Sequence, residues 1–474
     1  MTEKGKLYKH DNILVRVVGG VDRQFLGIII LFLCIGSVMV LSASYVYAKE
    51  YEGDSYYYAK KQLIFVILGL AAMVFSMNFD YNKLRKYSLL IFGAATVMLM
   101  LVLVIGKSGG GAQRWIYIGP VSVQPSEIMK FAVILLSADY IDKYSDKIKL
   151  RGQPKSMTRI SLPFLFLFFA GAVIAVIPFV IGKVVQKLAG STEQYLEDGS
   201  LNKYFSLYNT IKNMSALLVI AGIALVIFSF IFAKKKDIVH NAPDFVYGVF
   251  PFACIIALVG GLLIAQPHLS GLIIICTLVL IMMTVGGSSL KYISTAVAFV
   301  GGLMLMLMKI FPHASKRLMV WSNPFDYLKD DGWQPAQSLY AIGNGGLWGV
   351  GLGNSRQKHL YLPEPQNDYI FAILCEELGF IGALIVICMF VFFVYRGIKI
   401  AFRAPDRFSA LLVTGIVSQV GLQALLNMMV VTNTIPSTGI SLPFFSYGGS
   451  SLFILMCEMG VVLSVSRYSI LEKK

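Results

Sequence analysis

The acidic residue Asp368 stands where a polar segment meets a long apolar run, in the stretch YLPEPQNDYIFAILCEELGF from Tyr361 to Phe380. A carboxylate at the edge of a membrane can accept a proton from an attacking hydroxyl group, which makes it a candidate general base. It could alternatively hold a divalent cation that neutralises a diphosphate leaving group. A structural role is also open, because an acid at a helix N-terminus is stabilised by the helix dipole and commonly caps the helix.

The polar residues of the neighbouring segments suit a sugar linked to a lipid diphosphate. The cations that could bind anionic groups are Arg114, Arg317, Arg356 and Lys358. The amides that could bind hydroxyls are Gln334, Gln337, Asn354 and Gln357. Trp115 and Trp333 could stack on sugar faces, although anchoring at the membrane interface is the commoner role of tryptophan. Cations beside sugar-binding side chains at a membrane edge favour a lipid diphosphate-linked saccharide as ligand.

Charged residues inside apolar runs form a second set of candidates, because a charge within a membrane is costly and usually functional. Glu127 and Lys130, in QPSEIMKFAVILL, are three residues apart and so lie on one helix face, where they can pair. Both a structural ion pair and a place in a substrate path stay open for them. Glu458, in the last apolar run, is equally consistent with helix packing.

Two further glutamates follow Asp368 in the same run. Glu376 lies about two helical turns beyond it, roughly 12 Å deeper and roughly 80° around the helix, whereas Glu377 is nearly opposite. We therefore expect only one of them to share a cavity with Asp368. For the other, a hydrogen bond to a neighbouring helix is the better expectation.

Several other kinds of chemistry lack support in the sequence. No cluster of acids suggests a metal site built from protein alone, so a divalent cation, Mg²⁺ or Mn²⁺, would be shared with substrate. HExxH, Walker and GxSxG motifs are absent. The stretch GNGGLWGVGLGNS is rich in glycine but follows no βαβ pattern, so it does not indicate dinucleotide binding. The 6 cysteines all fall in apolar runs without a pairing pattern, which favours packing.

Membrane helices must position these residues. The chain of 474 residues is 57% hydrophobic and 14% charged, with a mean hydropathy of +0.71, which is too apolar for an ordinary soluble protein. Runs long enough to cross a bilayer recur, and their backbone polar groups can be satisfied in lipid only as helices. We expect an all-α bundle of twelve spans, near 25–47, 61–77, 87–106, 125–141, 161–184, 213–233, 246–265, 269–287, 291–309, 368–395, 408–431 and 449–468.

The distribution of charge predicts the orientation of the chain. The net charge of +15 does not indicate a nucleic-acid partner, because Lys and Arg concentrate on one side of the predicted spans. Most basic residues on the other side lie in two long loops, which respond weakly to the positive-inside rule. Both end segments, 1–24 and 469–474, are therefore expected in the cytoplasm and Asp368 outside. The polar N-terminal segment carries no secretory signal.

We expect one transmembrane domain, residues 25–468, with three special segments. The outer loop at about 309–367 is rich in Gly, Asn, Gln and aromatic residues and is expected to be ordered and functional. The uncharged segment Thr432–Ser451 contains Pro and Gly, which favours a re-entrant or cavity-lining loop. Residues 161–236 read as an added hairpin of two spans. No convincing internal repeat supports a transporter built from inverted halves.

Three separated motifs resemble the SEDS family (shape, elongation, division and sporulation), the group of FtsW and RodA. They are RWIYIGPVSVQPSEIMK at 114–130, DGWQPAQSLYAIGNGGLWGVGLGNSRQKHLYLPEPQNDYIFAILCEELGFIG at 331–382 and PSTGISLPFFSYGGSSL at 436–452. The resemblance implies a peptidoglycan glycosyltransferase in the bacterial cytoplasmic membrane. Such an enzyme polymerises lipid II through β-1,4 bonds at the outer face and releases undecaprenyl diphosphate.

The resemblance also implies partners and a cellular role. The family usually works with a class B penicillin-binding protein, which cross-links the strands, and with other membrane proteins of the divisome or elongasome. The sequence IPSTGISLPFFSYGGSS is more similar to FtsW and its sporulation relative than to RodA, which favours a role in division or sporulation.

Carried over by position, the family's essential acid in its LPExxxDFIF pattern falls on Asp368. Its intramembrane acid and base fall on Glu127 and Lys130. Glu364 and Ser446 lie in the matching motifs and are further candidates for substrate binding.

Three departures from the family pattern affect this site or its surroundings. Gln366 and Asn367 replace the His-Thr that often precedes the acid. The family motif QPDLGT appears as QPHLSG, so His268 replaces a carboxylate, which could change the charge balance of the site or its metal use. The hairpin at 161–236 is absent from the usual ten-span members.

Two other functions stay open at this point. A lipid II flippase needs polar access from the inner side, for which Glu127 and Lys130 are the natural route. A scaffold for a penicillin-binding partner is the other alternative, which His268 keeps open.

Overall fold

The computed structural model describes residues 7–10, 13–16, 20–148, 247–302 and 312–468, apart from short gaps at 106, 110–111, 119–120, 267, 289–291, 295–296, 299–300 and 330. Contacts divide the chain into two units, which are described separately. The first contains Met1–Lys143, Leu269–Met282 and His313–Lys474, and the second contains Tyr144–His268 and Met283–Pro312. The predicted hairpin at 161–236 lies outside the described residues, as does most of the predicted span at 291–309.

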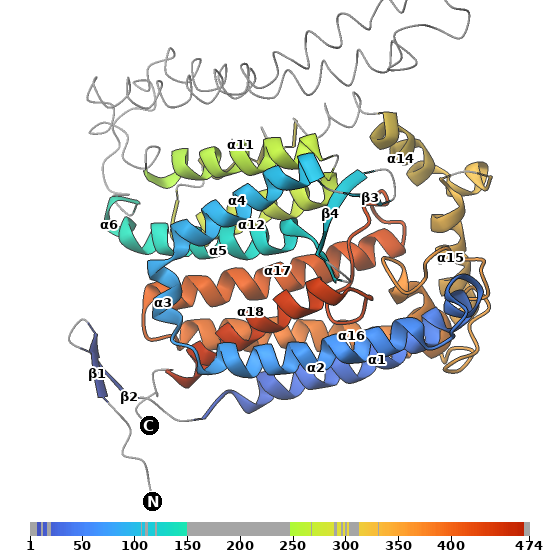
Figure 1. Ribbon diagram of the computed structural model, residues 1–474, viewed down its shortest axis with the longest axis horizontal. Coiled ribbons are helices and arrows are strands. Elements are labelled where there is room, and N and C mark those ends of the chain that lie inside the picture. Colours follow the sequence, from blue (N-terminus) through green and yellow to red (C-terminus); the bar gives the residue numbers. More distant parts are fainter. Residues whose placement is uncertain are drawn as a thin grey trace, which may run out of the picture. The chain divides into compact units, whose positions relative to one another are not determined.

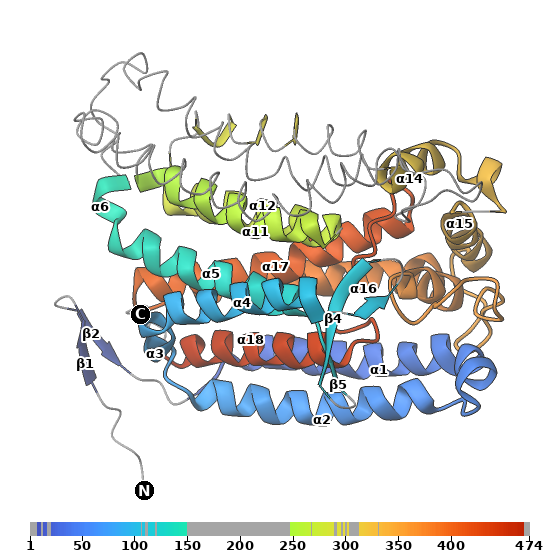
Figure 2. The same ribbon diagram turned by 45° about the horizontal axis from the view of Figure 1, so that its top comes forward.

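Helices make up most of the first unit (Figures 1 and 2). They are α1 (Arg23–Glu52), α2 (Tyr57–Asn78), α3 (Tyr81–Lys86), α4 (Ser88–Ile105), α5 (Pro125–Lys143), α12 (Leu269–Gly286), α14 (Pro312–Ser322), the 3-10 helix η2 (Pro324–Tyr327), α15 (Trp333–Gly345), α16 (Ile370–Phe402), α17 (Arg407–Val431) and α18 (Gly449–Arg467). Within the described residues, 6 helices are long and apolar enough to cross a membrane: α1, α2, α12, α16, α17 and α18. The prediction of a mostly helical, multi-pass membrane protein is confirmed.

The second unit contributes α6 (Ser145–Ile148) and the short apolar helix α11 (Phe250–Ala265). Tyr144 and Tyr247 stack with ring centroids 5.6 Å apart. His268 is buried, and its backbone N–H donates to the carbonyl of Leu263 at 2.9 Å.

Several predicted spans have different limits in the structure, and α16 shows the reason at its end. The span expected at 368–395 begins at Ile370 and continues to Phe402 as α16. Arg396 does not end the helix, because its guanidinium lies 2.7 Å from the Asp22 carboxylate and its charge is compensated. Asp22 also caps α1 by accepting from the N–H of Phe25 at 2.9 Å, so one acid ties α1 to α16.

Small antiparallel sheets depart from the all-α prediction. One pairs β1 (Leu7–His10) with β2 (Ile13–Arg16). The other joins β3 (Lys107–Gly109), β4 (Ala112–Ile118) and β5 (Val121–Val123), between α4 and α5. The first sheet precedes the first apolar run and the second lies between two runs, and β4 and β5 contain the β-branched and aromatic residues that favour strands. The sheet carries Arg114 and Trp115 on β4.

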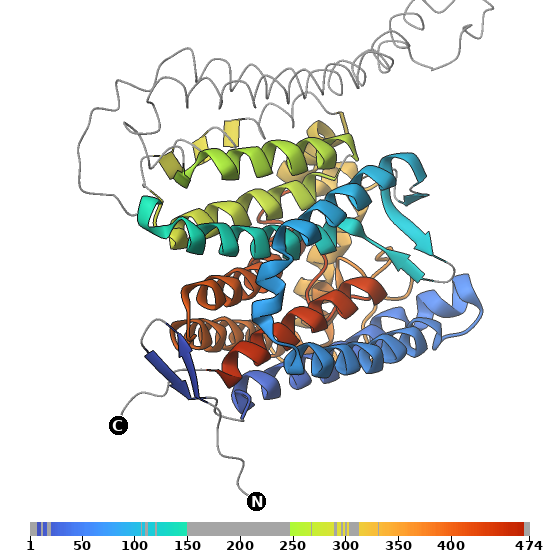
Figure 3. The ribbon, with the colours of Figure 1, turned by 60° about the vertical axis from the view of Figure 1, so that its left-hand side comes forward.

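Close helix packing holds α18 along α2 (Figure 3). Gly460 faces the backbone of α2, where a Cβ atom would overlap the carbonyl oxygen of Met73 and lie 2.6 Å from the Ser76 side chain. This contact therefore needs a residue without a side chain.

Replacing Gly460 by alanine tests this packing. Because the added methyl group meets backbone that cannot move aside, we expect a loss of about 1–3 kcal/mol of stability. Heating the protein in detergent and measuring the remaining monodisperse fraction gives the result. Gly27→Ala is the matched control, since nothing lies within 4 Å of a Cβ atom there. Equal melting of the two variants would contradict the close contact.

Candidate functional site

Asp368 lies just before α16, held in place by its backbone rather than by capping. The N-cap residue of α16 is Tyr369, which makes no side-chain cap. The Asn427 amide instead donates to the carbonyl oxygens of Asp368 and Ile440, each at 2.7 Å. Asn427 is fully buried on α17, so it joins the Asp368 turn to the loop that follows α17.

Two more contacts join the same pair of segments. The Ser446 hydroxyl donates to the carbonyl of Asn367 at 2.8 Å and accepts from the N–H of Leu442 at 2.8 Å. The N–H of Tyr447 donates to the carbonyl of Gln366 at 2.9 Å. Residues 366–368 are thus hydrogen-bonded to the 440–447 segment by polar groups that must be satisfied inside the protein.

The Asp368 carboxylate itself has three charged neighbours. Burial, and next the nearby Glu364 carboxylate, raise the pKa of Asp368 to about 6, while Arg114 and Arg317 act in the opposite direction. Gly439 lies against this carboxylate with a φ of +66°, and a Cβ there would be 3.1 Å from Oδ2. The Asp368 carboxyl group is therefore half-buried, with two guanidinium groups nearby. Its pKa of about 6 lies close to neutral pH.

The two arginines come from separate elements. Arg114 belongs to β4, and Arg317 belongs to α14 and donates to the carbonyl of Ser437 at 3.1 Å. Burial and the neighbouring Arg317 lower the pKa of Arg114. Guanidinium groups form strong hydrogen bonds to phosphates and carboxylates, so Arg114 and Arg317 are candidate groups for binding an anion.

A second polar cluster lies within the helices. Lys130 and Glu127 on α5 form an ion pair with Nζ and Oε2 2.7 Å apart. Glu458 on α18 accepts from the Gln419 amide of α17 at 3.1 and 3.3 Å and interacts electrostatically with Lys130 and Glu127. The predicted pairing of Glu127 with Lys130 is confirmed, and Glu458 adds a second carboxylate to it.

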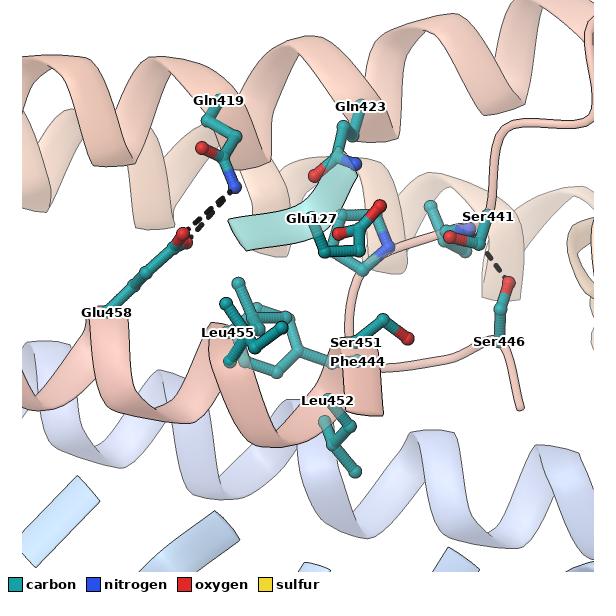
Figure 4. Close-up of a pocket in the computed structure, with 13 residues that line it drawn as sticks. Glu127, Gln419, Gln423, Ser441, Phe444, Ser446, Ser451, Leu452, Leu455 and Glu458 are labelled. Atoms are coloured by element: carbon teal, nitrogen blue, oxygen red, sulfur yellow. Dashed lines mark hydrogen bonds between the residues drawn. The ribbon is translucent and has the colours of Figure 1, made fainter. Parts of the chain in front are cut away.

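Glu127, Gln419 and Glu458 border a small pocket (Figure 4). Its lining residues are Glu127, Gln419, Gln423, Ser441, Leu442, Pro443, Phe444, Ser446, Ser451, Leu452, Ile454, Leu455 and Glu458. The loop after α17 forms one wall, which confirms that Thr432–Ser451 lines a cavity. Ser446 belongs both to this wall and to the hydrogen bonds that hold Asn367.

The sequence did not single out Gln419, Gln423 or Asn427. Gln419 and Gln423 are four residues apart in an apolar run, so one face of α17 is polar, and this pattern was a usable signal. Asn427 continues the same spacing by four residues. The partners of Gln419 and Asn427 lie on other elements, which the spacing does not reveal.

Glu376 and Glu377 contact a different part of the outer loop. Glu377 accepts from Ser42 of α1 at 2.7 Å and lies 3.0 Å from Lys358 Nζ. The predicted hydrogen bond to a neighbouring helix is therefore present at Glu377. Glu376 accepts from the hydroxyl of Ser355 and from the N–H groups of residues 356 and 357, at 3.2 and 3.3 Å.

The remaining predicted residues are distributed among three places. Gln357 and Lys358 are buried at the Glu376 and Glu377 cluster rather than beside Asp368. Asn354 donates to the carbonyl of Val350 at 3.3 Å in the same loop. On α15, Gln334 donates to Pro363 O at 3.3 Å, Trp333 donates to Tyr361 O at 2.6 Å, and Gln337 is buried. Trp115 is half-buried on β4, paired in register with Lys107.

The fold and the site together define a multi-pass helical membrane protein with an ionisable acid beside two arginines near the end of a span. The particular family follows from its sequence. Residues 22–190 and 216–470 match the FtsW, RodA and SpoVE family, described as "Cell cycle protein", and the chain belongs to this family.

Known relatives resemble the chain over nearly its whole length. Stage V sporulation protein E of Bacillus subtilis is 34% identical over 445 residues, covering 93% of this chain and 96% of that protein. The probable peptidoglycan glycosyltransferase FtsW of Geobacter metallireducens is 30% identical over 435 residues, covering 91% of each.

Solved structures share the fold. A peptidoglycan synthase complex that coordinates polymerization and crosslinking contains a chain with a TM-score of 0.62 at 19% identity, covering 94% of this chain and 98% of that one. The Thermus thermophilus rod shape determining protein RodA has a TM-score of 0.56 at 19% identity, covering 96% and 99%.

The electrostatics of Asp368 can be tested directly. Arg114→Gln removes a positive charge and should raise the pKa of Asp368 above about 6, whereas Glu364→Gln removes a negative charge and should lower it. Infrared difference spectra of ¹³C-aspartate-labelled protein against Asp368→Asn, recorded across pH, report this carboxyl group. Shifts of both variants in the same direction would refute the arrangement.

Removing members of the second cluster should have unequal effects. Lys130→Met leaves two carboxylates without their cation and should cost about 3–5 kcal/mol, while Glu127→Gln leaves Lys130 with Glu458 and should cost less. Removing both should cost less than the sum. Folded yield and melting temperature in detergent measure this. Normal yield of every variant with lost activity would instead place the pair in a substrate path.

Proposed function

We propose that this chain is a peptidoglycan glycosyltransferase that polymerises lipid II, with Asp368 as the general base. Its relatives include proteins named as probable peptidoglycan glycosyltransferases, and one solved neighbour belongs to a peptidoglycan synthase complex. The observation that carries the assignment is the place of the Asp368 carboxyl group, half-buried just before α16 with Arg114 and Arg317 nearby, where burial raises its pKa to about 6. A base that is mostly ionised at neutral pH and a binding place for a diphosphate then lie together.

Asp368, Arg114 and Arg317 each have a role in the proposed reaction step. The hydroxyl oxygen of the acceptor sugar attacks the anomeric carbon of the donor and gives its proton to Asp368. The bond between that carbon and the diphosphate oxygen breaks, and undecaprenyl diphosphate leaves with the electron pair. Arg114 and Arg317 stabilise the negative charge that grows on the leaving group. Asn427 and Ser446 position the base by donating hydrogen bonds to the backbone carbonyls of Asp368 and Asn367.

A divalent cation fits this site only with help from the substrate. In the part of the chain that the structure describes, no group of three or more His, Cys, Asp or Glu side chains could hold a metal. Asp368 and Glu364 would supply carboxylate oxygens, and the diphosphate would supply the others. Such an ion, Mg²⁺ or Mn²⁺, would neutralise charge on the leaving group.

The cellular setting completes the proposal. The apolar runs support twelve spans. The distribution of Lys and Arg supports both termini in the cytoplasm and the Asp368 site on the outer face of the bacterial inner membrane. A class B penicillin-binding protein would cross-link the strands, which the solved polymerization and crosslinking complex supports. Other divisome or elongasome proteins would join them in division or sporulation.

A lipid II flippase is the second candidate, and the buried polar pocket favours it. Glu127, Lys130 and Glu458 place charges inside the helices, where a polar headgroup would need them to cross. A scaffold without activity is the third, and rests on His268 in place of an acid.

One reconstitution separates these candidates. Purified wild type and Asp368→Asn are placed in lipid vesicles with lipid II and a penicillin-binding partner, and glycan polymer and lipid II transfer across the bilayer are measured. Loss of a general base should lower the polymerisation rate about 10²- to 10⁴-fold. Lipid II transfer should be unchanged.

Asp326→Asn is the matched control, because Asp326 is an exposed acid on η2 that only accepts from Asn323 at 2.8 Å. Equal polymer from wild type and Asp368→Asn would overturn the assigned role. Lipid II transfer lost together with polymer would favour the flippase, and no polymer from wild type would favour the scaffold.

A further inference from the structure

The outer loop between α15 and α16 contains a segment that the proposed function does not use. Residues Gly346–Leu352 follow α15 and run beside the interior of α16 instead of across its end. Both ribbon views draw the chain after α15 next to α16 and the end of α1 (Figures 1 and 2). A segment of the outer loop therefore returns to the side of a membrane helix.

A break in α16 provides backbone groups for this segment to bind. Gly379 has φ of +67° and ψ of −169°, which is not helical, so the helix loses its regular hydrogen bonds there. The carbonyls of Glu376 and Glu377 accept instead from the N–H groups of Val350 and Gly351, each at 3.0 Å. Four backbone groups around the break are satisfied in this way, because the N–H groups of residues 380 and 381 also donate to the carbonyls of residues 346 and 347, at 2.9 and 3.2 Å.

The segment is built from residues that permit this close approach. At Gly349, with φ of +81°, a Cβ atom would overlap the carbonyl of Glu377. At Gly345 it would overlap the carbonyl of Cys375. The glycine-rich motif therefore lets one backbone lie directly on another, which is needed where lipid offers no hydrogen bonds.

The position of the break along α16 sets its depth. A helix of 33 residues is about 50 Å long, whereas the hydrocarbon core is about 30 Å thick, so about 10 Å would extend beyond each boundary. Gly379 lies about 14 Å from the start of the helix at Ile370. The break, and residues 346 and 347 that pair with residues 380 and 381 beyond it, therefore fall just inside the hydrocarbon region on the Asp368 side. Val350 and Gly351, which pair with Glu376 and Glu377, lie at about its boundary.

The side chains of the segment match that environment. Leu347 is 63% exposed, Trp348 80% and Leu352 53%, and no charged residue occurs between Trp333 and Ser355. On α16, Phe380 and Leu384 continue the same exposed apolar surface. Apolar groups exposed beside a membrane helix are expected to face lipid tails.

The end of the segment is fixed by buried charge. Lys358 and Glu377 pair at 3.0 Å with side chains nearly inaccessible to solvent, and Ser42 of α1 completes the group. Glu376 accepts from the backbone of the turn at residues 356 and 357. The two glutamates therefore hold the chain where it leaves the apolar region, which gives them a role away from Asp368.

We propose that Gly346–Leu352 is a re-entrant segment whose exposed side chains bind the acyl chains of the lipid leaflet on the Asp368 side. It is a lipid-binding surface within a loop that the charge distribution assigns wholly to the water outside. The proposal does not depend on the reaction that Asp368 performs.

Tryptophan fluorescence tests the proposal, because the chain has only 4 tryptophans. A variant with Trp115, Trp321 and Trp333 replaced by Phe keeps Trp348 alone. In bilayers of brominated phosphatidylcholine its emission should be strongly quenched, with a blue-shifted maximum and little quenching by iodide in the buffer. The matched control keeps Trp333 alone, whose indole is bound to Tyr361 O, before the start of α16. It should be quenched less by brominated lipid and more by iodide.

If the triple variant does not fold, Trp348→Phe in the otherwise wild-type chain gives the same information. It should remove the part of the emission that brominated lipid quenches. Iodide quenching of Trp348 without quenching by brominated lipid would overturn the proposal. Protection of Trp348 from both quenchers would also overturn it, and would mean that a second copy of the chain covers the segment.

Discussion

A backbone amide or carbonyl that leaves a helix inside a membrane must find its partner within the protein, and much of this structure follows from that constraint. The loop after α17 contains Pro and Gly and cannot be helical, so its backbone is satisfied by Asn427 and Ser446. The same two side chains also hold the turn that carries Asp368. The side chains that stabilise this non-helical loop among the helices therefore also fix the backbone of the base.

The two polar clusters differ in how their charges are balanced. Around Asp368, a second carboxylate and two guanidinium groups are the charged neighbours, and burial together with Glu364 raises the pKa of Asp368 against the effect of the cations. Around Lys130, two carboxylates share one cation. The first arrangement leaves a group able to take a proton near neutral pH and cations able to meet an anion. The second is a compact network in which each charge depends on the others.

The sequence predicted what depends on local spacing and composition. Apolar runs located the long helices, the i,i+3 spacing paired Glu127 with Lys130, and helical geometry predicted a hydrogen bond from one of the two glutamates to a neighbouring helix, which Glu377 makes. The expectation that the other glutamate shares a cavity with Asp368 was wrong, because Glu376 binds residues 355–357 of the outer loop. The sequence did not predict contacts between distant residues, such as that between Ser42 and Glu377, because no local pattern records which helices are neighbours. The sheet around Arg114 was missed for a similar reason, since its strands are only 3 to 7 residues long.

Ser446 has one hydroxyl hydrogen, and that hydrogen is already given to Asn367. The same hydroxyl stands in the wall of the pocket that Glu127 and Glu458 line. A molecule in the pocket that accepts a hydrogen bond from the Ser446 hydroxyl would compete with the carbonyl oxygen of Asn367, the residue next to Asp368. Such a molecule would therefore remove one of the hydrogen bonds that hold the backbone beside Asp368.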